Sequence, residues 1–502
     1  MSEKVEQLKQ HLYRYHDLHG AAAVLGWDEE VNMPPKGAEG RAEQMATLTA
    51  LAHEIFTSEE TGRLLEEAEA EVADMDYRSD EASLVRVVRR DYDKMTKLPT
   101  ELVAEFSRAT SHAFIAWREA RQDDDYGHFK PHLQHLLDLI LQTVEIIGYE
   151  DEPYDALLDF YEPGMKTAEV RALFESLKAG LLPLLEAIQE RGAAVDNSFL
   201  TEQSYPVERQ WELTEVILRK IGYDFSRGRQ DKAPHPFTTE FSPGDVRITT
   251  RLFPNFPQAA IFGSIHEGGH ALYEQGIPFK FARTALGHGA TLGLHESQSR
   301  LWENMVGRSR NFWRYFFPIM QAFFPQQLMA VDLDTFYRAI NRVKPDLIRV
   351  EADEVTYNFH IFIRFELEQA MVNGELSLDD LPEAWNEKYR AYLKITPPTD
   401  ADGCLQDVHW AHGTLGYFPT YTLGNLISAQ LFRRVRSEIP DLEAGFAEGE
   451  FKPLLDWLRE HVHRHGAKFT APELLEFELG ESLDARPLID YLTTKYRAIY
   501  RL

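Results

Sequence analysis

The sequence is poor in cysteine, in basic residues and in long apolar runs. It has one cysteine among 502 residues, Cys404, so no disulfide can form within the chain. A lone cysteine is typical of a reducing compartment, and we therefore expect a cytoplasmic protein. Cys404 has no obvious activating partner, so we expect a small buried residue and not a nucleophile.

Basic residues are outnumbered, because 53 Lys and Arg against 81 Asp and Glu give a formal net charge of −28. No basic tract compensates for this charge, which argues against a nucleic-acid partner. Uninterrupted apolar runs stay well below the roughly 18 residues that a membrane helix needs. The first residues, MSEKVEQLKQHLYRYH, lack the apolar core of a signal peptide. We therefore expect an unexported protein with no membrane span.

Apolar residues recur at helical spacing over most of the chain, which predicts a mainly α fold. One such segment runs from Trp211 to Ile221, where Gly222 should end the helix. The exception is DVRITTRLF at 245–253, in which apolar and polar residues alternate as in a strand. Another strand is expected near HPFTTEF at 235–241. These patterns predict a large helical body with a small β-sheet near its middle.

The sequence HEGGH at 266–270 is the strongest chemical signal. On a helix, His266 and His270 lie almost above each other, so both imidazoles can bind one metal ion. Glu267 lies beside them, displaced enough to reach a water instead of the metal. Zinc lowers the pKa of its water to about 7, and a carboxylate can take the proton as this water attacks a carbonyl. The pattern therefore predicts a zinc-dependent peptidase with Glu267 as the general base.

An HExxH match can also arise by chance, and the other interpretation is two hydrogen-bonded histidines on a buried helix. Gly268 and Gly269 favour the metal site. Each glycine inside a helix costs roughly 0.5–1 kcal/mol relative to alanine, so two in succession need a reason. They indicate that a substrate or a neighbouring strand approaches the helix backbone closely.

A catalytic zinc site usually has a third protein ligand and one open position. The metzincin pattern would place a histidine where this chain has Gly276, so that pattern does not apply. Glu274 shares the face of His270 but lies far along the helix axis. Glu296, in HESQSRLWEN, is better placed if its helix runs antiparallel to the first. The other interpretation of Glu296 is a solvated charge in the first turn of its helix.

Six motifs occur in an order that resembles the carboxypeptidase Taq family of zinc metallocarboxypeptidases. The family pattern is HPF, DxRxT, HExxH, HES/GQ, I/VRxxAD and GxxQDxHW. The matching segments are HPF at 235–237, DVRIT at 245–249, HEGGH at 266–270, HESQ at 295–298, IRVEAD at 348–353 and GCLQDVHW at 403–410. The resemblance covers essentially the whole chain.

The resemblance implies a mainly α fold with a deep active-site groove, similar to neurolysin and angiotensin-converting enzyme, and with the small sheet near the zinc site. Residues 1–502 would form a single catalytic domain, which could comprise two helical halves flanking the groove. Family members remove single amino acids from peptide C-termini with broad tolerance. They use zinc, for which cobalt can substitute, and are commonly homodimers. His266, His270 and Glu296 would be the ligands, and Glu267 the base.

Further matching residues are candidates for substrate binding. Arg349 is expected to bind the terminal carboxylate of the substrate, because a guanidinium pairs with a carboxylate bidentately. The other interpretation is an ion pair with a nearby acid, and Asp353 could hold Arg349 in position. His409, Tyr417 and Tyr421 could donate hydrogen bonds to the substrate or to the developing oxyanion. The tyrosines could equally be packing residues with satisfied hydroxyls.

The strand motif and a late histidine series complete the candidates. Asp245, Arg247 and Thr249 should form a polar wall near the metal, with Asp245 as a partner for a histidine ligand. The other interpretation is an ordinary exposed strand face. A histidine series among basic residues is expected to be a solvated helix end and not a second metal site. It comprises His461, His463 and His465.

Two other functions fit part of the pattern. A helical-groove zinc oligopeptidase or dipeptidyl carboxypeptidase would share the metal site but lack a cation one residue beyond the cut. A non-catalytic scaffold would use the metal only to join two helices, and would leave Glu267 without a purpose. Metal removal separates the scaffold from the enzymes, because it would unfold a scaffold and merely inactivate an enzyme.

Overall fold

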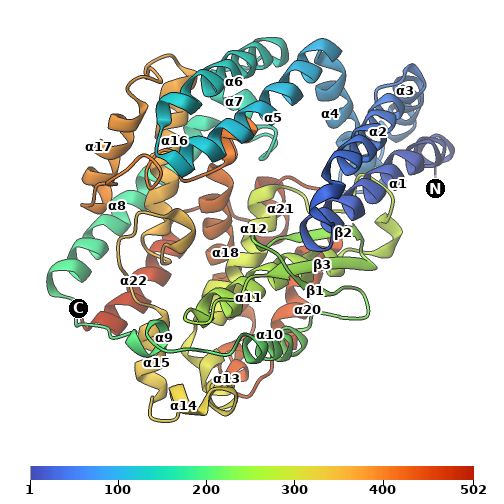
Figure 1. The fold of residues 1–502 in the computed structure, drawn as a ribbon. Coiled ribbons are helices and arrows are strands. Elements are labelled where there is room, and N and C mark those ends of the chain that lie inside the picture. Colours follow the sequence, from blue (N-terminus) through green and yellow to red (C-terminus); the bar gives the residue numbers. More distant parts are fainter. Residues whose placement is uncertain (1) are drawn as a thin grey trace. The chain divides into compact units, whose positions relative to one another are not determined.

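The computed structural model describes residues 2–502, and helices make up most of it (Figure 1). These residues fall into two compact units, each assembled from three separate stretches of chain. The first unit holds residues up to Met95, Asp196–Ile340 and Ile427–Ser482, and the second holds Thr96–Val195, Asn341–Leu426 and Leu483–Leu502. The predicted mainly α fold is confirmed. Among the described residues, no helix combines the length and the apolarity needed to cross a membrane.

The first unit contains the sheet and most of the helices. Its elements are α1 (Glu3–Val31), η1 (Pro35–Gly37), α2 (Ala38–Phe56), α3 (Glu59–Val72), α9 (Ser198–Thr201), α10 (Val207–Ile221), β1 (Gln230–Lys232), β2 (Thr238–Ser242), β3 (Asp245–Thr250), α11 (Pro257–Gly276), η2 (Phe279–Phe281), α12 (Leu292–Arg300), the π-helix η3 (Leu301–Gly307), α13 (Arg310–Phe323), α14 (Pro325–Leu328), α15 (Leu333–Ile340), α19 (Leu442–Ala447), α20 (Lys452–His461), η6 (His463–His465) and α21 (Ala471–Leu479).

The second unit is purely helical within the described residues. Its elements are α5 (Thr100–Asp123), α6 (Tyr126–Ile147), α7 (Pro153–Leu158), α8 (Thr167–Arg191), η4 (Arg349–Glu351), α16 (Tyr357–Val372), α17 (Leu381–Leu393), η5 (His409–His412) and α22 (Arg486–Tyr500). Two further helices contain residues of both units, namely α4 (Asp80–Lys97) and α18 (Pro419–Glu438).

Helix α10 shows how the local sequence sets an element. Its apolar residues Leu213, Ile217 and Leu218 fall on one buried face, as the helical spacing predicts. Gly222 ends the helix with a φ of 110°, a left-handed conformation that glycine adopts without the steric penalty of a Cβ. The predicted helix and its end are therefore confirmed.

The sheet has three strands in the order β1-β3-β2 (Figure 1). Strand β3 pairs in parallel with β1 and antiparallel with β2. Val246 and Ile248 are fully buried and face the core, as the alternation predicts. The strand ends at Thr250, three residues before the predicted end at Phe253, and the sequence pattern missed β1. Both β2 and β3 contact α11, so the sheet lies beside the helix that carries HEGGH.

Helix α11 is buried on nearly all sides. It begins with Pro257, whose fixed φ suits the first position of a helix and whose missing N–H has no helical partner there. Ile261 and Leu272, which flank HEGGH, are both almost completely buried. The environment predicted from those apolar flanks is therefore observed.

The two glycines of HEGGH lie against neighbouring helices. A Cβ on Gly269 would be 2.6 Å from the Cα of Ser299 and 2.7 Å from the carbonyl oxygen of Gln298, both in α12. A Cβ on Gly268 would be 2.7 Å from the Leu218 side chain of α10. The close approach expected from the sequence is thus made by helices and not by a strand.

The prediction of a solvated end for the late histidine series is wrong. Helix α20 ends at His461, and the chain then turns inward, so that His463 is completely buried. Its Nε2 lies 3.0 Å from Oε1 of Gln298, and its ring lies against Tyr273. His461 and His465 both contact the carboxylate of Glu478. The prediction placed all three histidines on one continuous helix, whereas α20 ends at His461.

Replacing Gly269 with Ala should destabilise the protein, because the new methyl group meets the backbone of α12 and cannot be relieved by a side-chain rotation. We expect a loss of about 1–3 kcal/mol in the free energy of unfolding, measured by urea denaturation. Gly263→Ala is the matched control in the same helix, since its Cβ would meet only the Pro236 side chain at 3.9 Å. An equal loss in both variants would contradict this account.

Candidate metal centre

Helix α11 presents His266 and His270 on one face, four residues apart, with ring centroids separated by 5.0 Å. Both side chains keep some solvent access, at 19% and 15% exposure. This residual access suits a site that a ligand must enter. The helical geometry predicted for HEGGH is therefore observed.

Helix α12 brings the third group to these histidines. The Thr291 side chain caps its first turn by accepting a hydrogen bond from the Leu294 amide. Oε2 of Glu296 then lies 3.5 Å from Nε2 of His266 and 3.3 Å from Nε2 of His270. These three residues form a group whose ligand atoms all lie within 4.8 Å of one another. The geometry therefore favours Glu296 over Glu274 as the third ligand.

The donor set fits a divalent metal ion. Two imidazole nitrogens and one carboxylate oxygen are a common three-ligand set for a catalytic transition-metal site. The other oxygen of Glu296, Oε1, accepts a hydrogen bond from Nε of Arg300 at 2.6 Å. This bond leaves Oε2 directed at the two histidines.

His266 is oriented by a carboxylate on its other side. Its Nδ1 lies 2.9 Å from Oε2 of Glu303, which belongs to the π-helix η3. Although burial alone would raise the pKa of Glu303, the hydrogen bond from His266 and the charges of Arg300 and Arg308 lower that pKa to about 2. A permanently ionised acceptor keeps the hydrogen of His266 on Nδ1 and leaves Nε2 able to bind metal.

His270 is oriented by a second imidazole. Its Nδ1 lies 2.5 Å from Nδ1 of His295, whose Nε2 lies 2.8 Å from Oε1 of Glu274. One nitrogen of the close pair must carry the hydrogen. If Nε2 of neutral His270 is to bind metal, then Nδ1 of His270 donates to His295, and His295 donates in turn to Glu274. Glu274 is thus linked to His270 through two successive hydrogen bonds.

Glu267 lies beside the ligands without joining them. Its Oε2 accepts a hydrogen bond of 2.7 Å from the hydroxyl of Thr238 in β2. Burial raises the pKa of Glu267, against the opposing effects of His266 and Thr238. A carboxylate with a raised pKa takes up a proton more readily, as a general base must.

Electrostatics prepare the three candidate ligands. Burial lowers the pKa of His270 to about 3, so its ring is neutral. Burial would also lower the pKa of His266, but the carboxylates of Glu296 and Glu303 outweigh it and raise that pKa. Burial would raise the pKa of Glu296, yet Arg300 and the two histidines hold it well below its usual value. Glu296 is therefore an anion that is ready to bind a cation.

The strand residues expected beside the metal make other contacts. The carboxylate of Asp245 pairs with Arg247, with Oδ2 to Nη2 at 2.8 Å, and the guanidinium of Arg247 lies over the Trp27 ring. Thr249 is fully buried, and its hydroxyl accepts a hydrogen bond from the Phe237 amide. The predicted polar face therefore does not include Thr249, because this residue is buried. Glu303 and His295, and not Asp245, contact the histidines.

The other candidate residues gather in the second unit around Asp407. Arg349 is buried and donates from Nε and Nη2 to Oδ1 of Asp407, at 3.1 and 2.9 Å. Its guanidinium lies 4.8 Å from the ring centre of Tyr421, whose hydroxyl is 3.2 Å from Nε2 of His409. The ring of Tyr417 lies 5.3 Å from that of His409.

Asp353 does not hold Arg349, so the expectation that it positions this guanidinium is wrong. Its Oδ1 instead accepts hydrogen bonds from the amides of Val355 and Thr356, just before α16 begins. It therefore orders the start of that helix. The acid that holds Arg349 is Asp407, 58 residues along the chain.

Comparison with known proteins identifies the family. The family model described as carboxypeptidase Taq (M32) metallopeptidase matches residues 7–496. The chain belongs to this family. Among M32 relatives, thermostable carboxypeptidase 1 of Thermus thermophilus is 47% identical over 492 residues, covering 96% of each chain. Carboxypeptidase 1 of Bacillus subtilis is 42% identical over 482 residues, again covering 96% of each.

Solved structures of M32 carboxypeptidases share the fold. The M32 carboxypeptidase of Deinococcus radiodurans R1 superposes with a TM-score of 0.96 at 42% identity, over 100% of both chains. Metallocarboxypeptidase 1 of Trypanosoma cruzi gives 0.93 at 32% identity, also over 100% of both. The family resemblance and the fold class read from the sequence are confirmed. The chain is a metallocarboxypeptidase, which acts on peptides with the help of a metal ion.

Three residues that contact the candidate site residues were not predicted from the sequence. Glu303 lies in no motif, although it follows Glu296 by seven residues. His295 and Asp407 do lie in motifs, as the first residue of HESQ and within GCLQDVHW. Their position inside two of the matching motifs was the available signal, but a motif does not say which residues they contact.

Replacing Glu303 with Ala should weaken metal binding by about 10- to 100-fold, because His266 loses the acceptor that fixes its hydrogen on Nδ1. Metal affinity is measured by competition with a chelating dye, and circular dichroism reports whether the variant folds. Asp245→Ala is the matched control, since it removes a carboxylate that pairs with Arg247. If Asp245→Ala proved the more damaging, the strand and not η3 would orient the ligands.

Proposed function

We propose that this metallocarboxypeptidase uses zinc and removes single amino acids from the C-termini of peptides with broad specificity. The observation that carries the proposal is the cluster of His266, His270 and Glu296, with Glu267 beside it. Two histidines and one glutamate are a usual ligand set of catalytic zinc sites in peptidases. The names of the M32 relatives support the carboxypeptidase activity over an oligopeptidase activity.

In the proposed mechanism, His266, His270 and Glu296 hold the ion. Bound there, zinc would act as a Lewis acid toward the scissile carbonyl and lower the pKa of the attacking water. Glu267 accepts the proton from this water as its oxygen attacks the carbonyl carbon. When the C–N bond breaks, Glu267 passes the same proton to the leaving amine nitrogen. Thr238 holds the carboxylate of Glu267 in place through both transfers.

Arg349 is proposed to bind the terminal carboxylate of the substrate. A carboxypeptidase must recognise the charge that every free C-terminus carries and that an internal segment lacks. Asp407 holds the Nε side of the guanidinium, and the hydroxyl of Tyr357 accepts from Nη1 at 3.0 Å. These contacts orient a rigid cation with limited solvent access, which strengthens its attraction for an anion.

His409 and a tyrosine are proposed to contact the substrate carbonyl. Burial lowers the pKa of His409 to about 3, so the ring is neutral and offers one N–H. Its contact with the Tyr421 hydroxyl ties that tyrosine to the cluster of Arg349. Tyr417 packs against the same imidazole and is the other candidate.

The family resemblance supports further proposals. We propose that Co²⁺ can replace zinc, that residues 1–502 work as one catalytic domain, and that the enzyme is a cytoplasmic homodimer. Activity of the cobalt-loaded apoenzyme tests the first, and a single unfolding transition tests the second. A monomeric mass in sedimentation, or recovery outside the cytoplasmic fraction, would contradict the last.

Glu267→Gln should keep zinc but lose roughly 10²–10⁴ in kcat, because the amide cannot accept and return the proton. Zinc is measured by elemental analysis and kcat with an N-blocked peptide. Thr238→Val is a milder companion variant, which removes the hydroxyl that contacts the carboxylate and the carbonyl oxygen of Glu267 and leaves the base in place. Near-normal turnover by Glu267→Gln would refute the proposed role of Glu267.

A peptide amidated at its C-terminus should be cut far more slowly than the free acid. A charge-assisted hydrogen bond contributes roughly 1.5–3 kcal/mol, which corresponds to about 10- to 150-fold in kcat/KM. In Arg349→Ala this preference should largely disappear while the zinc content stays normal. Arg171→Ala is the control, because it removes a cation of the same unit that pairs with Gln369 and Glu152.

Two results would separate the alternatives. If the wild-type enzyme cut both peptides equally, the oligopeptidase or dipeptidyl carboxypeptidase activity would replace the proposal. If the preference for the free acid persisted in Arg349→Ala, another cation would bind the carboxylate, and only the assignment of Arg349 would fall.

A further inference from the structure

Helix α16 of the second unit carries two buried side chains of opposite charge, one turn apart. Arg364 and Glu368 are both completely buried. Residues four apart on a helix share a face, and both of these contact the segment 406–416. This segment contains His409 and ends just before Tyr417.

Arg364 holds the beginning of the segment. Its Nε donates to Oδ2 of Asp407 at 2.6 Å, and its Nη2 donates to Oε1 of Gln406 at 2.8 Å. Asp407 in turn pairs with Arg349. One end of the segment is therefore fixed by a cation of α16.

Glu368 holds the rest of the segment. Its Oε1 accepts from the indole Nε1 of Trp410 at 2.8 Å, and its Oε2 accepts from the Gly416 amide at 3.1 Å. The hydroxyl of Tyr154 in α7 also donates to Oε2, at 2.6 Å. Gly416 has a φ of 93°, and a Cβ there would be 2.8 Å from the Leu157 backbone. The chain between Trp410 and Gly416 thus has little freedom to shift.

Keeping a carboxylate in this place is costly. Burial raises the pKa of Glu368 to about 7, although its three hydrogen bonds and Arg364 act in the opposite direction. An apolar side chain would fill the same space without the desolvation of a charge. Stability alone is therefore a weak reason for a glutamate here.

We propose that Glu368 is a positioning residue for substrate binding. It fixes the segment from Trp410 to Gly416, and so sets where the flanking His409 and Tyr417 lie. This inference rests on the proposed function, in which these two side chains contact the substrate. Glu368 lies outside the six sequence motifs and is absent from the metal centre.

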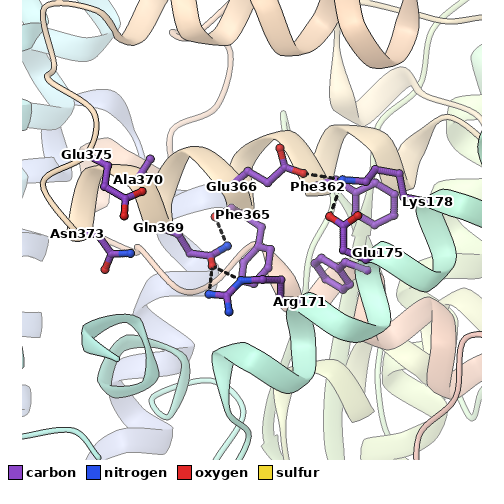
Figure 2. Close-up of a pocket in the computed structure, with 11 residues that line it drawn as sticks. Arg171, Glu175, Lys178, Phe362, Phe365, Glu366, Gln369, Ala370, Asn373 and Glu375 are labelled. Carbon is purple, nitrogen blue, oxygen red and sulfur yellow. Dashed lines mark hydrogen bonds and ion pairs between the residues drawn. The ribbon is translucent and has the colours of Figure 1, made fainter. Parts of the chain in front are cut away.

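The opposite face of α16 supplies a matched control. There, Glu366 pairs with Lys178 and Lys388 and contacts the hydroxyl of Tyr392. Figure 2 shows Glu366 and Lys178 in a groove between α8 and α16, in which neighbouring charged and amide side chains pair with one another. Glu366→Gln therefore removes an ionised group from the same helix without touching the segment 406–416.

The decisive variant is Glu368→Gln in the metal-loaded enzyme. A glutamine amide has one acceptor and one donor end, so either Trp410 or Gly416 must face an N–H group in place of an oxygen. We expect faster amide hydrogen exchange within 406–418 and normal metal content. We also expect kcat/KM for a free-acid peptide to fall about twofold to tenfold, the range for one lost hydrogen bond. Glu366→Gln should change neither quantity.

The outcomes are separable. Faster exchange with unchanged kcat and KM would overturn the proposal, because Glu368 would then be only structural. An equal kinetic loss in Glu366→Gln would overturn it as well. If Glu368→Gln does not fold, Tyr154→Phe is the second variant, because it removes one of the three donors to Glu368. It should give a smaller change in the same direction. An unchanged exchange rate and an unchanged kcat/KM in Tyr154→Phe would contradict the proposal. If the wild-type enzyme cut the free-acid and the amidated peptide equally well, the proposed function would be refuted. The hydrogen-exchange data would still show whether Glu368 fixes the segment 406–416.

Discussion

The approach of α12 to α11 at Gly269 is the constraint on which the metal centre depends. Because residue 269 has no Cβ, the backbone of Ser299 can approach the helix that carries both histidines. Glu296, three residues earlier in α12, then lies between the two imidazoles. A larger residue at 269 would move the carboxylate away from both nitrogens at once, so the ligand distance and the helix packing are set by the same contact.

The same stretch of chain also fixes the orientation of the histidines. His295 contacts Nδ1 of His270, and Glu303 contacts Nδ1 of His266, so the residues that flank Glu296 on either side act on the two remaining ligands. Arg300 lies between them and binds the other oxygen of Glu296. The third ligand, the groups that orient the histidines and the counter-charge of Arg300 therefore belong to one short segment of chain. This arrangement preorganises the site before an ion binds.

The sequence predicted what depends on local spacing. The helical phase of HEGGH, the alternation of Val246 and Ile248 and the glycine end of α10 involve neighbours along the chain, and all three are observed. The contacts of Glu303 were beyond this reasoning, because a π-helix winds more widely than the α-helix that the spacing assumes.

Contacts between residues far apart along the chain could not be predicted from the sequence either. The pairing of Arg349 with Asp407 joins positions 58 residues apart, and that of His463 with Gln298 joins positions 165 apart. A motif marks such residues as chemically unusual, but it does not say which of several acids or amides each one meets. The spacing of HEGGH and the family resemblance supplied the roles of the candidate ligands. The geometry supplied the partners that orient the histidines and Arg349, namely Glu303, His295 and Asp407.

The interleaving of the two units has a consequence for synthesis on the ribosome. The first unit opens with the stretch up to Met95, but its last stretch begins only at Ile427, about 330 residues later. At typical translation rates of 5–20 residues per second, roughly 17 to 66 s pass before the last stretch of the first unit begins to be made. During that interval Tyr77, Arg78 and Arg86 lack their partners in the last stretch, which are Glu473, the ring of Phe477 and the carbonyl oxygen of Lys468, respectively. Neither unit can be released by a single truncation, so vectorial folding of this chain ends with its last helices.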